Sequence, residues 1–215
     1  MTLFLDSASV DDARKVAALG FVAGITTNPA LIAKALNSET RLETRTDRIA
    51  ALCEAFPGTV MVQLTAATWA ERETEGWTLL DLCPGRVGLK IPSTPENFSL
   101  ARRFAAEGHA VGMTAIFSPG QVYLASEAGA KYVLPYVNRS TRLLGDGLAL
   151  VRQMRAVIDA LESPLRILAA SIKTPEEAVD TLLAGAHGLT LPLDVMLALG
   201  QHPLSERTIA EFAKS

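Results

Sequence analysis

The sequence is poor in the residues that bind metals or form disulfides. It contains two cysteines and three histidines among 215 residues. Cys53 and Cys83 are far apart in the sequence and match no metal-binding or redox spacing. We therefore expect both to be buried free thiols in a reducing cytoplasm. No acidic pair or histidine cluster is available as a ligand set, so we expect neither a metal ion nor another cofactor.

Strong charge and long apolar runs are also lacking. The net charge is −3 and the pI is near 5.7, which favours neither nucleic acid nor an anionic membrane as a partner. Residues 16–33 contain no charge and approach transmembrane length. Gly20, Gly24 and the polar residues 26–28 interrupt this run, and Asp6 interrupts the apolar N-terminus before a signal peptide could form. We expect a cytoplasmic protein.

Aliphatic residues dominate what is present. Hydrophobic residues make up 49% of the chain, whereas aromatic residues make up 6%. An interior built mainly of alanine, valine, leucine and isoleucine is therefore expected. The length is that of one domain with a large core, and no linker or low-complexity stretch divides it. We predict a single domain over residues 1–215.

Short apolar segments alternate with helical ones along the whole chain. The predicted strands are residues 2–5, 22–26, 59–64, 86–91, 109–114, 131–136, 165–170 and 188–191. Helices are predicted between them, among them residues 39–56 and 148–161, and two helices follow in residues 194–214. Eight strand–helix repeats predict a (β/α)8 barrel with an extra C-terminal helix. The alternative is an open doubly wound sheet, but residues 6–9 do not form the glycine-rich phosphate loop expected after its first strand.

Lys90 stands at the end of the fourth predicted strand, directly after Leu89. One interpretation is a surface lysine, or one held in an ion pair. The other is a buried lysine whose pKa is lowered by desolvation, so that its free amine attacks a carbonyl.

Polar residues follow seven of the predicted strands, at the barrel end where such folds carry their chemistry. They are Asp6, Thr26, Asn28, Gln63, Lys90, Thr114, Tyr136, Arg139, Ser171 and Lys173. Each alone could be a cap or turn residue. All three histidines fall elsewhere, so a serine or cysteine nucleophile lacks a base.

The remaining groups suit Schiff-base chemistry. Lys90 would condense with a ketone, and the iminium would accept electrons from the adjacent C–C bond. A water held by Gln63, Thr114 and Tyr136 would relay protons. Lys173 is a competing nucleophile, but Arg139, Ser171 and the helix start that follows favour a phosphate site there.

Six stretches together resemble the small transaldolase family, and most closely its fructose-6-phosphate aldolase members. They are FLDSA at residues 4–8, GITTNP at 24–29, LKIP at 89–92, YVLPYVNR at 132–139, AASIKTP at 169–175 and LTLPLDV at 189–195. The resemblance covers nearly the whole chain.

The resemblance implies roles for these residues. Lys90 would be the Schiff-base lysine. Asp6 and Asn28 would bind hydroxyls of the dihydroxyacetone unit, with Thr26 supporting them. The phosphate of the aldehyde partner would be bound by Arg139, Ser171 and Lys173. A homo-oligomeric ring, a pentamer or decamer, is also implied.

Two positions within the resemblance favour an aldolase. Transaldolases of the family generally carry glutamate where this chain has Gln63, and phenylalanine where it has Tyr136. The expected reaction is the reversible cleavage of fructose 6-phosphate to dihydroxyacetone and glyceraldehyde 3-phosphate. A transaldolase, which would depend on an acceptor sugar, is the alternative. A sugar-phosphate-binding barrel without turnover is a third, against which intact Asp6, Gln63, Lys90 and Tyr136 argue.

Leu134 departs from the family, which usually has alanine or serine at this position. An inward-pointing leucine would narrow the donor site and remove a possible hydrogen bond. Hydroxyacetone, or another less polar donor, is therefore expected to compete with dihydroxyacetone.

Overall fold

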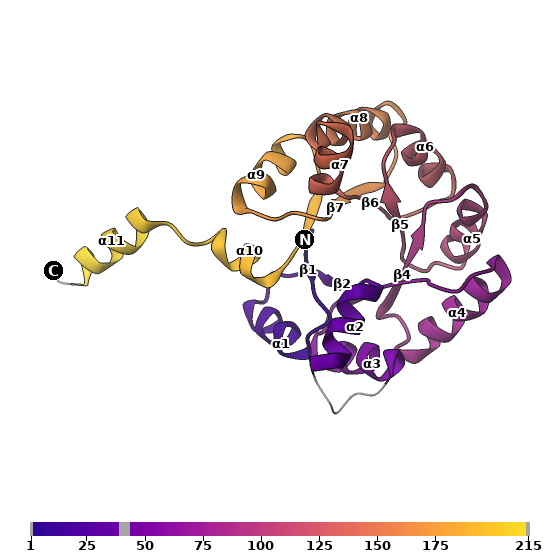
Figure 1. Ribbon diagram of the computed structural model, residues 1–215, viewed down its shortest axis with the longest axis horizontal. Coiled ribbons are helices and arrows are strands. Elements are labelled where there is room, and N and C mark those ends of the chain that lie inside the picture. The colour runs from indigo at the N-terminus through magenta and orange to yellow at the C-terminus, as the bar shows by residue number, and fades with distance from the viewer. Residues whose placement is uncertain (1, 39–43, 214–215) are drawn as a thin grey trace.

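The chain folds into a closed barrel of eight parallel strands, each neighbouring the next in sequence (Figure 1). The structure is a computed structural model and describes residues 2–38 and 44–213. The strands are β1 (Leu3–Asp6), β2 (Gly24–Thr26), β3 (Thr59–Gln63), β4 (Val87–Pro92), β5 (Val111–Ile116), β6 (Tyr132–Pro135), β7 (Arg166–Ala169) and β8 (Gly188–Leu191). β1 pairs with β8 and closes the sheet. The predicted (β/α)8 barrel is confirmed, and the open doubly wound sheet is wrong.

The helices surround the barrel on its outside, except for the last of them, which extends away from it (Figure 1). They are α1 (Val10–Leu19), α2 (Pro29–Ser38), α3 (Arg45–Ala55), α4 (Trp69–Leu82), α5 (Pro95–Ala106), α6 (Pro119–Glu127), α7 (Val137–Leu144), α8 (Gly147–Ala160), α9 (Pro175–Leu183), α10 (Leu193–Ala198) and α11 (Pro203–Phe212). Local signals set many of their ends. The Ser9 side chain accepts a hydrogen bond from the Asp12 amide at the start of α1, and left-handed Gly20 ends that helix.

The structure differs from the sequence prediction at several element ends and at one helix. α3 begins at Arg45, because Thr44 is extended and forms a capping box with Asp47; residues 39–43 lie outside the described residues. β5 begins at Val111, because the His109 amide still bonds to Phe104 at the end of α5. The sequence does not predict α7, since Tyr136 precedes it without a side-chain cap that would mark its start.

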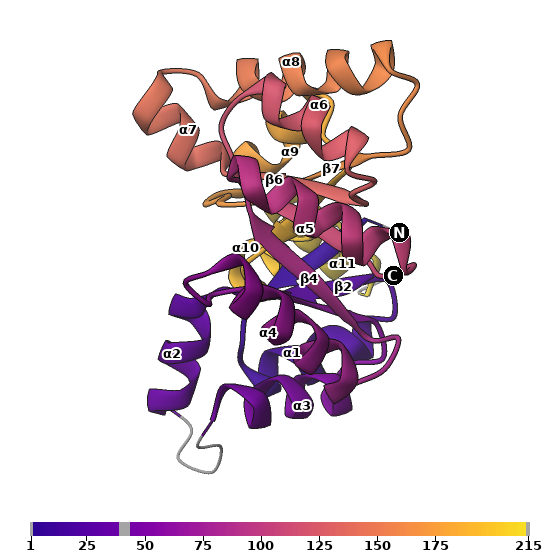
Figure 2. The same ribbon diagram turned by 90° about the vertical axis from the view of Figure 1, so that its right-hand side faces the viewer.

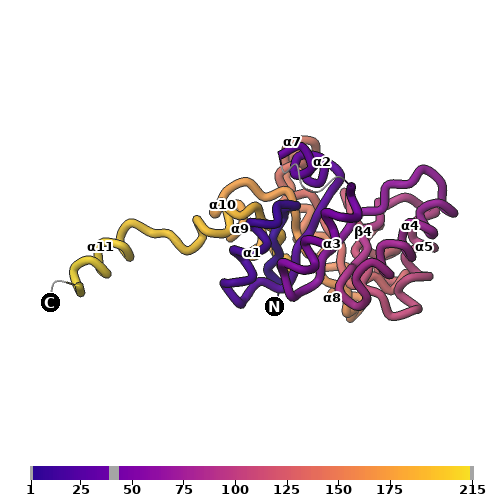
Figure 3. The backbone as a smooth tube through the Cα atoms, turned by 90° about the horizontal axis from the view of Figure 1, so that it is seen from below, coloured from indigo at the N-terminus to yellow at the C-terminus, as the bar shows by residue number. Residues whose placement is uncertain are grey.

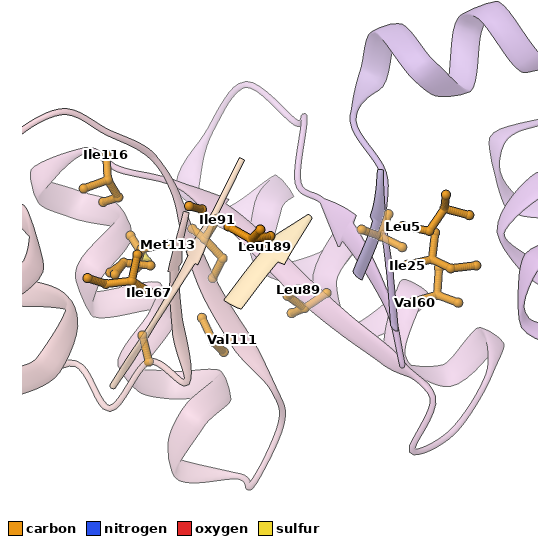
Figure 4. Packing of buried hydrophobic residues seen from close by; sticks show 14 of the residues in the cluster. Leu5, Ile25, Val60, Leu89, Ile91, Val111, Met113, Ile116, Ile167 and Leu189 are labelled. Carbon is orange, nitrogen blue, oxygen red and sulfur yellow. The ribbon is translucent and has the colours of Figure 1, made fainter. Parts of the chain in front are cut away.

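The strands are buried on both faces, the one towards the helices and the one towards the barrel interior. The outward side chains form the main core beneath the helices; Figure 4 shows Leu89, Ile91 and Val111 among them. A second, inward cluster fills the barrel and consists of Phe4, Met61, Tyr132, Leu134 and Leu168. Because side chains alternate along a strand, the inward positions two residues later lie in a layer above this cluster.

The upper layer faces the end of the barrel at which the strands finish. Two additional helices, α2 after β2 and α7 after β6, lie at this end, opposite the N-terminus (Figures 2 and 3). This places the predicted site residues at one mouth. Within the residues described, no helix has the length and apolar character needed to cross a membrane.

The C-terminal helix α11 extends away from the barrel (Figures 1 and 3). The extra C-terminal helix predicted from the sequence is thus present. Large apolar side chains on it remain mostly in contact with solvent: Leu204 is 63% and Ile209 65% exposed. The helix therefore presents apolar surface beyond the edge of the barrel.

The two cysteines, distant in sequence, meet in space. Cys53 is buried on α3, and Cys83 is the residue that follows α4. Both are free thiols, and Cys83 is only half-buried. Burial and a hydrogen bond with Cys83 raise the pKa of Cys53 to about 12. The prediction of buried free thiols is therefore confirmed for Cys53, whereas Cys83 is free but not buried.

Candidate active site

Lys90 is the only lysine that is buried among the described residues, with 3% of its surface exposed. It points into the barrel from β4, and its Nζ donates a hydrogen bond to the Thr27 backbone carbonyl at 2.8 Å. Burial lowers the pKa of Lys90 to about 8, and the Asp6 carboxylate opposes that shift. The interpretation as a surface lysine is wrong.

Asp6 ends β1 and faces the same layer. Its carboxylate accepts a hydrogen bond from the Thr26 hydroxyl at 2.9 Å. Burial raises the pKa of Asp6, although the positive charge of Lys90 acts in the opposite direction. The raised pKa of the acid and the lowered pKa of the amine have the same cause, because both groups are withdrawn from water.

Thr190 on β8 belongs to this layer and is missed by the sequence analysis. Its hydroxyl lies 2.6 Å from that of Thr26, and both threonines are fully buried. Thr190 extends the hydrogen-bonded chain from Asp6 across the seam that closes the barrel. The signal was available, because Thr190 is the inward polar residue of the eighth predicted strand.

Gln63, Thr114 and Tyr136 stand around the other side of Lys90. Gln63 is the register partner of Lys90 across β3 and β4, so both side chains point inward at one level. The Thr114 and Tyr136 hydroxyls are 2.9 Å apart. The Tyr136 ring is fixed by an edge-on contact with Phe117. These three side chains are the ones from which the sequence predicts a water site.

The predicted phosphate-binding residues come from α7 and from the loop after β7. Arg139 is exposed on α7, with its guanidinium carbon 4.8 Å from the centroid of the Tyr136 ring. The Asn138 amide donates to the Ser171 carbonyl, which ties α7 to the loop after β7. Ser171 has a positive φ of 60°, a strained conformation for serine.

Of two further residues of the predicted set, Lys173 is exposed and Asn28 is half-buried. The Lys173 amide donates to the Glu177 carboxylate at 2.7 Å, so the start of α9 is already capped by the chain itself. Burial raises the pKa of Asp6, and the positive charge of Lys173 is one of the smaller influences that oppose this rise. Asn28 accepts a hydrogen bond from the Leu31 amide and so caps α2, which leaves its side-chain amide nitrogen for a ligand.

Leu134 points inward and is fully buried in the cluster below the site. It fills the space above Gly112, where a Cβ would lie 2.8 Å from its Cδ1. Gly112 is in turn the register partner of Lys90. Leu134 therefore forms part of an apolar floor beneath the lysine.

Histidines and clusters of potential metal ligands are the other groups that could carry chemistry at this end of the barrel. No three acidic, histidine or cysteine side chains gather in a metal-binding arrangement within residues 2–38 and 44–213. The histidines serve elsewhere: His187 accepts a hydrogen bond from the Ile167 amide, His109 packs edge-on against Trp77, and His202 caps α11.

The site thus contains a buried lysine of lowered pKa on β4 and an aspartate on β1 whose charge acts on that lysine. Both residues lie in sequence stretches that resemble the small transaldolase family. The sequence profile of the family described as Transaldolase/Fructose-6-phosphate aldolase matches residues 3–215. The chain belongs to this family. It is therefore a transaldolase-family enzyme of carbohydrate metabolism.

Relatives of similar length support this assignment. The chain is 36% identical over 215 residues to a "Probable transaldolase" of Thermus thermophilus, covering 99% of this chain and 96% of that protein. It is 36% identical over 214 residues to one of Prosthecochloris aestuarii, with the same coverage. A third, from Phenylobacterium zucineum, is 37% identical over 212 residues, covering 99% and 94%.

A solved structure shows the fold alone. The crystal structure of a mandelate oxidase variant matches with a TM-score of 0.63 at 13% identity, covering 92% of this chain and 67% of the oxidase. At this identity only the barrel is shared, and the transaldolase-family assignment depends on the sequence.

Proposed function

We propose that this transaldolase-family protein is a Schiff-base aldolase that reversibly cleaves fructose 6-phosphate to dihydroxyacetone and glyceraldehyde 3-phosphate. The observation that carries the proposal is the buried Lys90 amine, whose pKa is lowered to about 8, close to the Asp6 carboxylate. At neutral pH a useful fraction of such an amine is unprotonated and nucleophilic.

The proposed reaction begins when Lys90 Nζ attacks the ketone and water leaves, forming an iminium. The C4 hydroxyl then loses its proton and the bond between C3 and C4 breaks. The electron pair of the C3–C4 bond moves into the iminium and forms an enamine. Glyceraldehyde 3-phosphate leaves, the enamine carbon takes up a proton, and water hydrolyses the imine to release dihydroxyacetone. In this scheme a water bound by Gln63, Thr114 and Tyr136 relays the protons.

Substrate recognition is assigned to the remaining site residues. Asp6 and Asn28 would bind donor hydroxyls, supported by Thr26, and Arg139, Ser171 and Lys173 would bind the phosphate. Transfer to an acceptor sugar is the second candidate, because the relatives named above carry the description transaldolase. Gln63 and Tyr136 favour release over transfer.

Borohydride trapping tests the proposal directly. The protein is reduced in the presence of dihydroxyacetone or of hydroxyacetone, and the adduct is located by peptide mass spectrometry. A reduced adduct on the Lys90 peptide is expected. An adduct on Lys173 would reverse the two lysine roles, and no adduct with either ketone would favour a binding protein without turnover.

The same experiment examines the donor. Because Leu134 makes the floor apolar and fully packed, hydroxyacetone is expected to label Lys90 at least as well as dihydroxyacetone at equal concentration. Strong preference for dihydroxyacetone would mean that Leu134 does not restrict the donor.

Replacing Gln63 by glutamate is expected to shift the enzyme towards transfer. A carboxylate in place of the amide binds the water differently and competes for its proton, so hydrolysis of the imine should slow relative to capture by erythrose 4-phosphate. We expect the ratio of release to transfer to fall about tenfold. The ratio is measured from products with and without acceptor; an unchanged ratio would contradict the role of Gln63.

We also propose that the protein forms a homo-oligomer, as the family resemblance implies. The exposed apolar side chains of α11 support this proposal. Covering Leu204 and Ile209 with a second subunit removes apolar surface from water and so stabilises the oligomer. Sedimentation equilibrium should give a mass that is a multiple of 22.9 kDa. A monomer at micromolar concentration would refute the oligomer.

A further inference from the structure

We propose that Arg45 and Glu75 are positioning residues that hold the end of β3, and through it the Gln63 side chain, beside Lys90. Both residues lie on the helices outside the barrel, and neither was among the predicted site residues. The inference depends on the proposed function, because it assigns a role to the residue pair through the water-binding part of that site.

Arg45 completes the hydrogen bonding of the last residue of β3. The ladder between β2 and β3 ends at Thr26 and Met61, where the Thr27 amide donates to the Met61 carbonyl. The Gln63 carbonyl is two residues further along and points to the same side, beyond the last ladder bond. Arg45 Nη2 donates a hydrogen bond to this carbonyl and so takes the place of a strand.

Glu75 holds the residues that follow. Its carboxylate accepts hydrogen bonds from the Thr65 amide at 2.8 Å and from the Ala66 amide at 2.9 Å. The Thr65 hydroxyl donates to it at 2.9 Å. Burial would raise the pKa of Glu75, but the hydrogen bonds from Arg45 and from these backbone amides lower it below its usual value. Glu75 therefore remains ionised wherever the enzyme is expected to work.

The two residues act as one unit. Arg45 forms an ion pair with Glu75, and Arg45 Nη1 also donates to the Thr65 hydroxyl at 3.1 Å. The pair is largely covered, with 29% of the Arg45 and 15% of the Glu75 side chain exposed. The contacts of the pair with Gln63, Thr65 and Ala66 exceed what a helix-to-helix ion pair requires, and all of them converge on the end of β3.

We refer to Arg45 and Glu75 together as the clamp. The end of β3 connects the clamp to Lys90. On its other edge the same strand end bonds to β4, where the Leu64 amide donates to the Lys90 carbonyl at 2.9 Å. A shift of the β3 end would therefore change the separation of Gln63 and Lys90. Small displacements of a group that orients water reduce a rate strongly.

The loop itself has a separate support, so loss of the clamp should leave the fold intact. Arg72 on α4 donates to the Ala66 and Ala67 carbonyls at 2.9 and 2.7 Å. The same guanidinium also bonds to Asn97 on α5. The clamp is thus needed for the position of Gln63, while Arg72 anchors the rest of the loop to the helices.

The test compares Glu75→Gln and Arg45→Lys with Glu73→Gln as the matched control. Glu73 lies on the same helix as Glu75 but pairs with Arg103 of α5. We expect both clamp variants to lower kcat for fructose 6-phosphate cleavage about tenfold or more. The ratio of release to transfer should also change in both, because water placement is altered. The control should match the unmodified enzyme in both quantities.

A Gln63→Ala background shows whether the clamp acts through Gln63. If it does, Glu75→Gln or Arg45→Lys should have no further effect in this background. An equal loss in both backgrounds, or an unchanged ratio in variants that fold normally by circular dichroism, would overturn the positioning role. Borohydride trapping on the unmodified enzyme separates the two proposals. No Lys90 adduct overturns the proposed function and this inference with it, whereas an adduct with an unchanged ratio overturns the inference alone.

Discussion

Replacing Lys90 by methionine is expected to lower aldol cleavage at least about a thousandfold while leaving the fold intact, because the attacking amine is removed and nothing replaces it. Methionine has nearly the same length as lysine, so it fits the buried site, in which only 3% of the surface of Lys90 is exposed. The substitution destabilises the fold by removing the hydrogen bond to the Thr27 carbonyl. It also stabilises the fold, because no charged group then has to be withdrawn from water. Steady-state assays and circular dichroism measure the two effects.

Lys173→Met is the matched control for this variant. Lys173 is an exposed lysine at the same mouth, so its loss should weaken substrate binding through KM and leave borohydride labelling of Lys90 in place. Appreciable turnover by Lys90→Met, or loss of all labelling in Lys173→Met, would remove the central assignment.

The pH dependence follows from the same amine. A lysine with a pKa of about 8 is about one-tenth unprotonated at pH 7 and half unprotonated at pH 8. The free amine is the reactive form, so kcat/KM should rise with pH and level off above about pH 8. A lysine of ordinary pKa would still show a rising rate at about pH 10.

Asp6→Asn is expected to reduce kcat about a hundredfold or more. The amide retains the hydrogen bond from Thr26 but loses the charge that can accept a proton or bind a donor hydroxyl strongly. The variant should also move the pH profile. The Asp6 carboxylate supports protonated Lys90, so without it the pKa of Lys90 falls further and kcat/KM should level off at lower pH.

The two parts of this prediction are separable. Asp11→Asn, which removes an exposed carboxylate paired with Arg14 on α1, should leave both the rate and the pH profile unchanged. A pH profile of Asp6→Asn that coincides with that of the unmodified enzyme would show that Asp6 does not influence Lys90. An unchanged kcat would exclude Asp6 from the site.

Much of the fold and of the site could be predicted because the relevant signals are local. Each barrel strand is a short apolar run, and several helices begin with a hydroxyl cap and end near a glycine, as α1 does. In a closed parallel barrel every strand delivers its last inward residue to the same mouth, so reading the strand ends identified Asp6, Gln63, Lys90 and Thr114 without knowledge of their contacts.

The sequence by itself therefore determined the order of strands, the barrel end at which the active site is proposed and the nucleophile proposed there. Only the tertiary structure decided how strongly Lys90 is buried, that Thr190 continues the Asp6 chain across the closing seam, and that Arg45 and Glu75 meet at the end of β3. Arg45 and Glu75 are 30 positions apart on different helices. No periodicity or cap links them, because their contact depends on how α3 and α4 pack around the barrel, which long-range burial and closure of the sheet determine together.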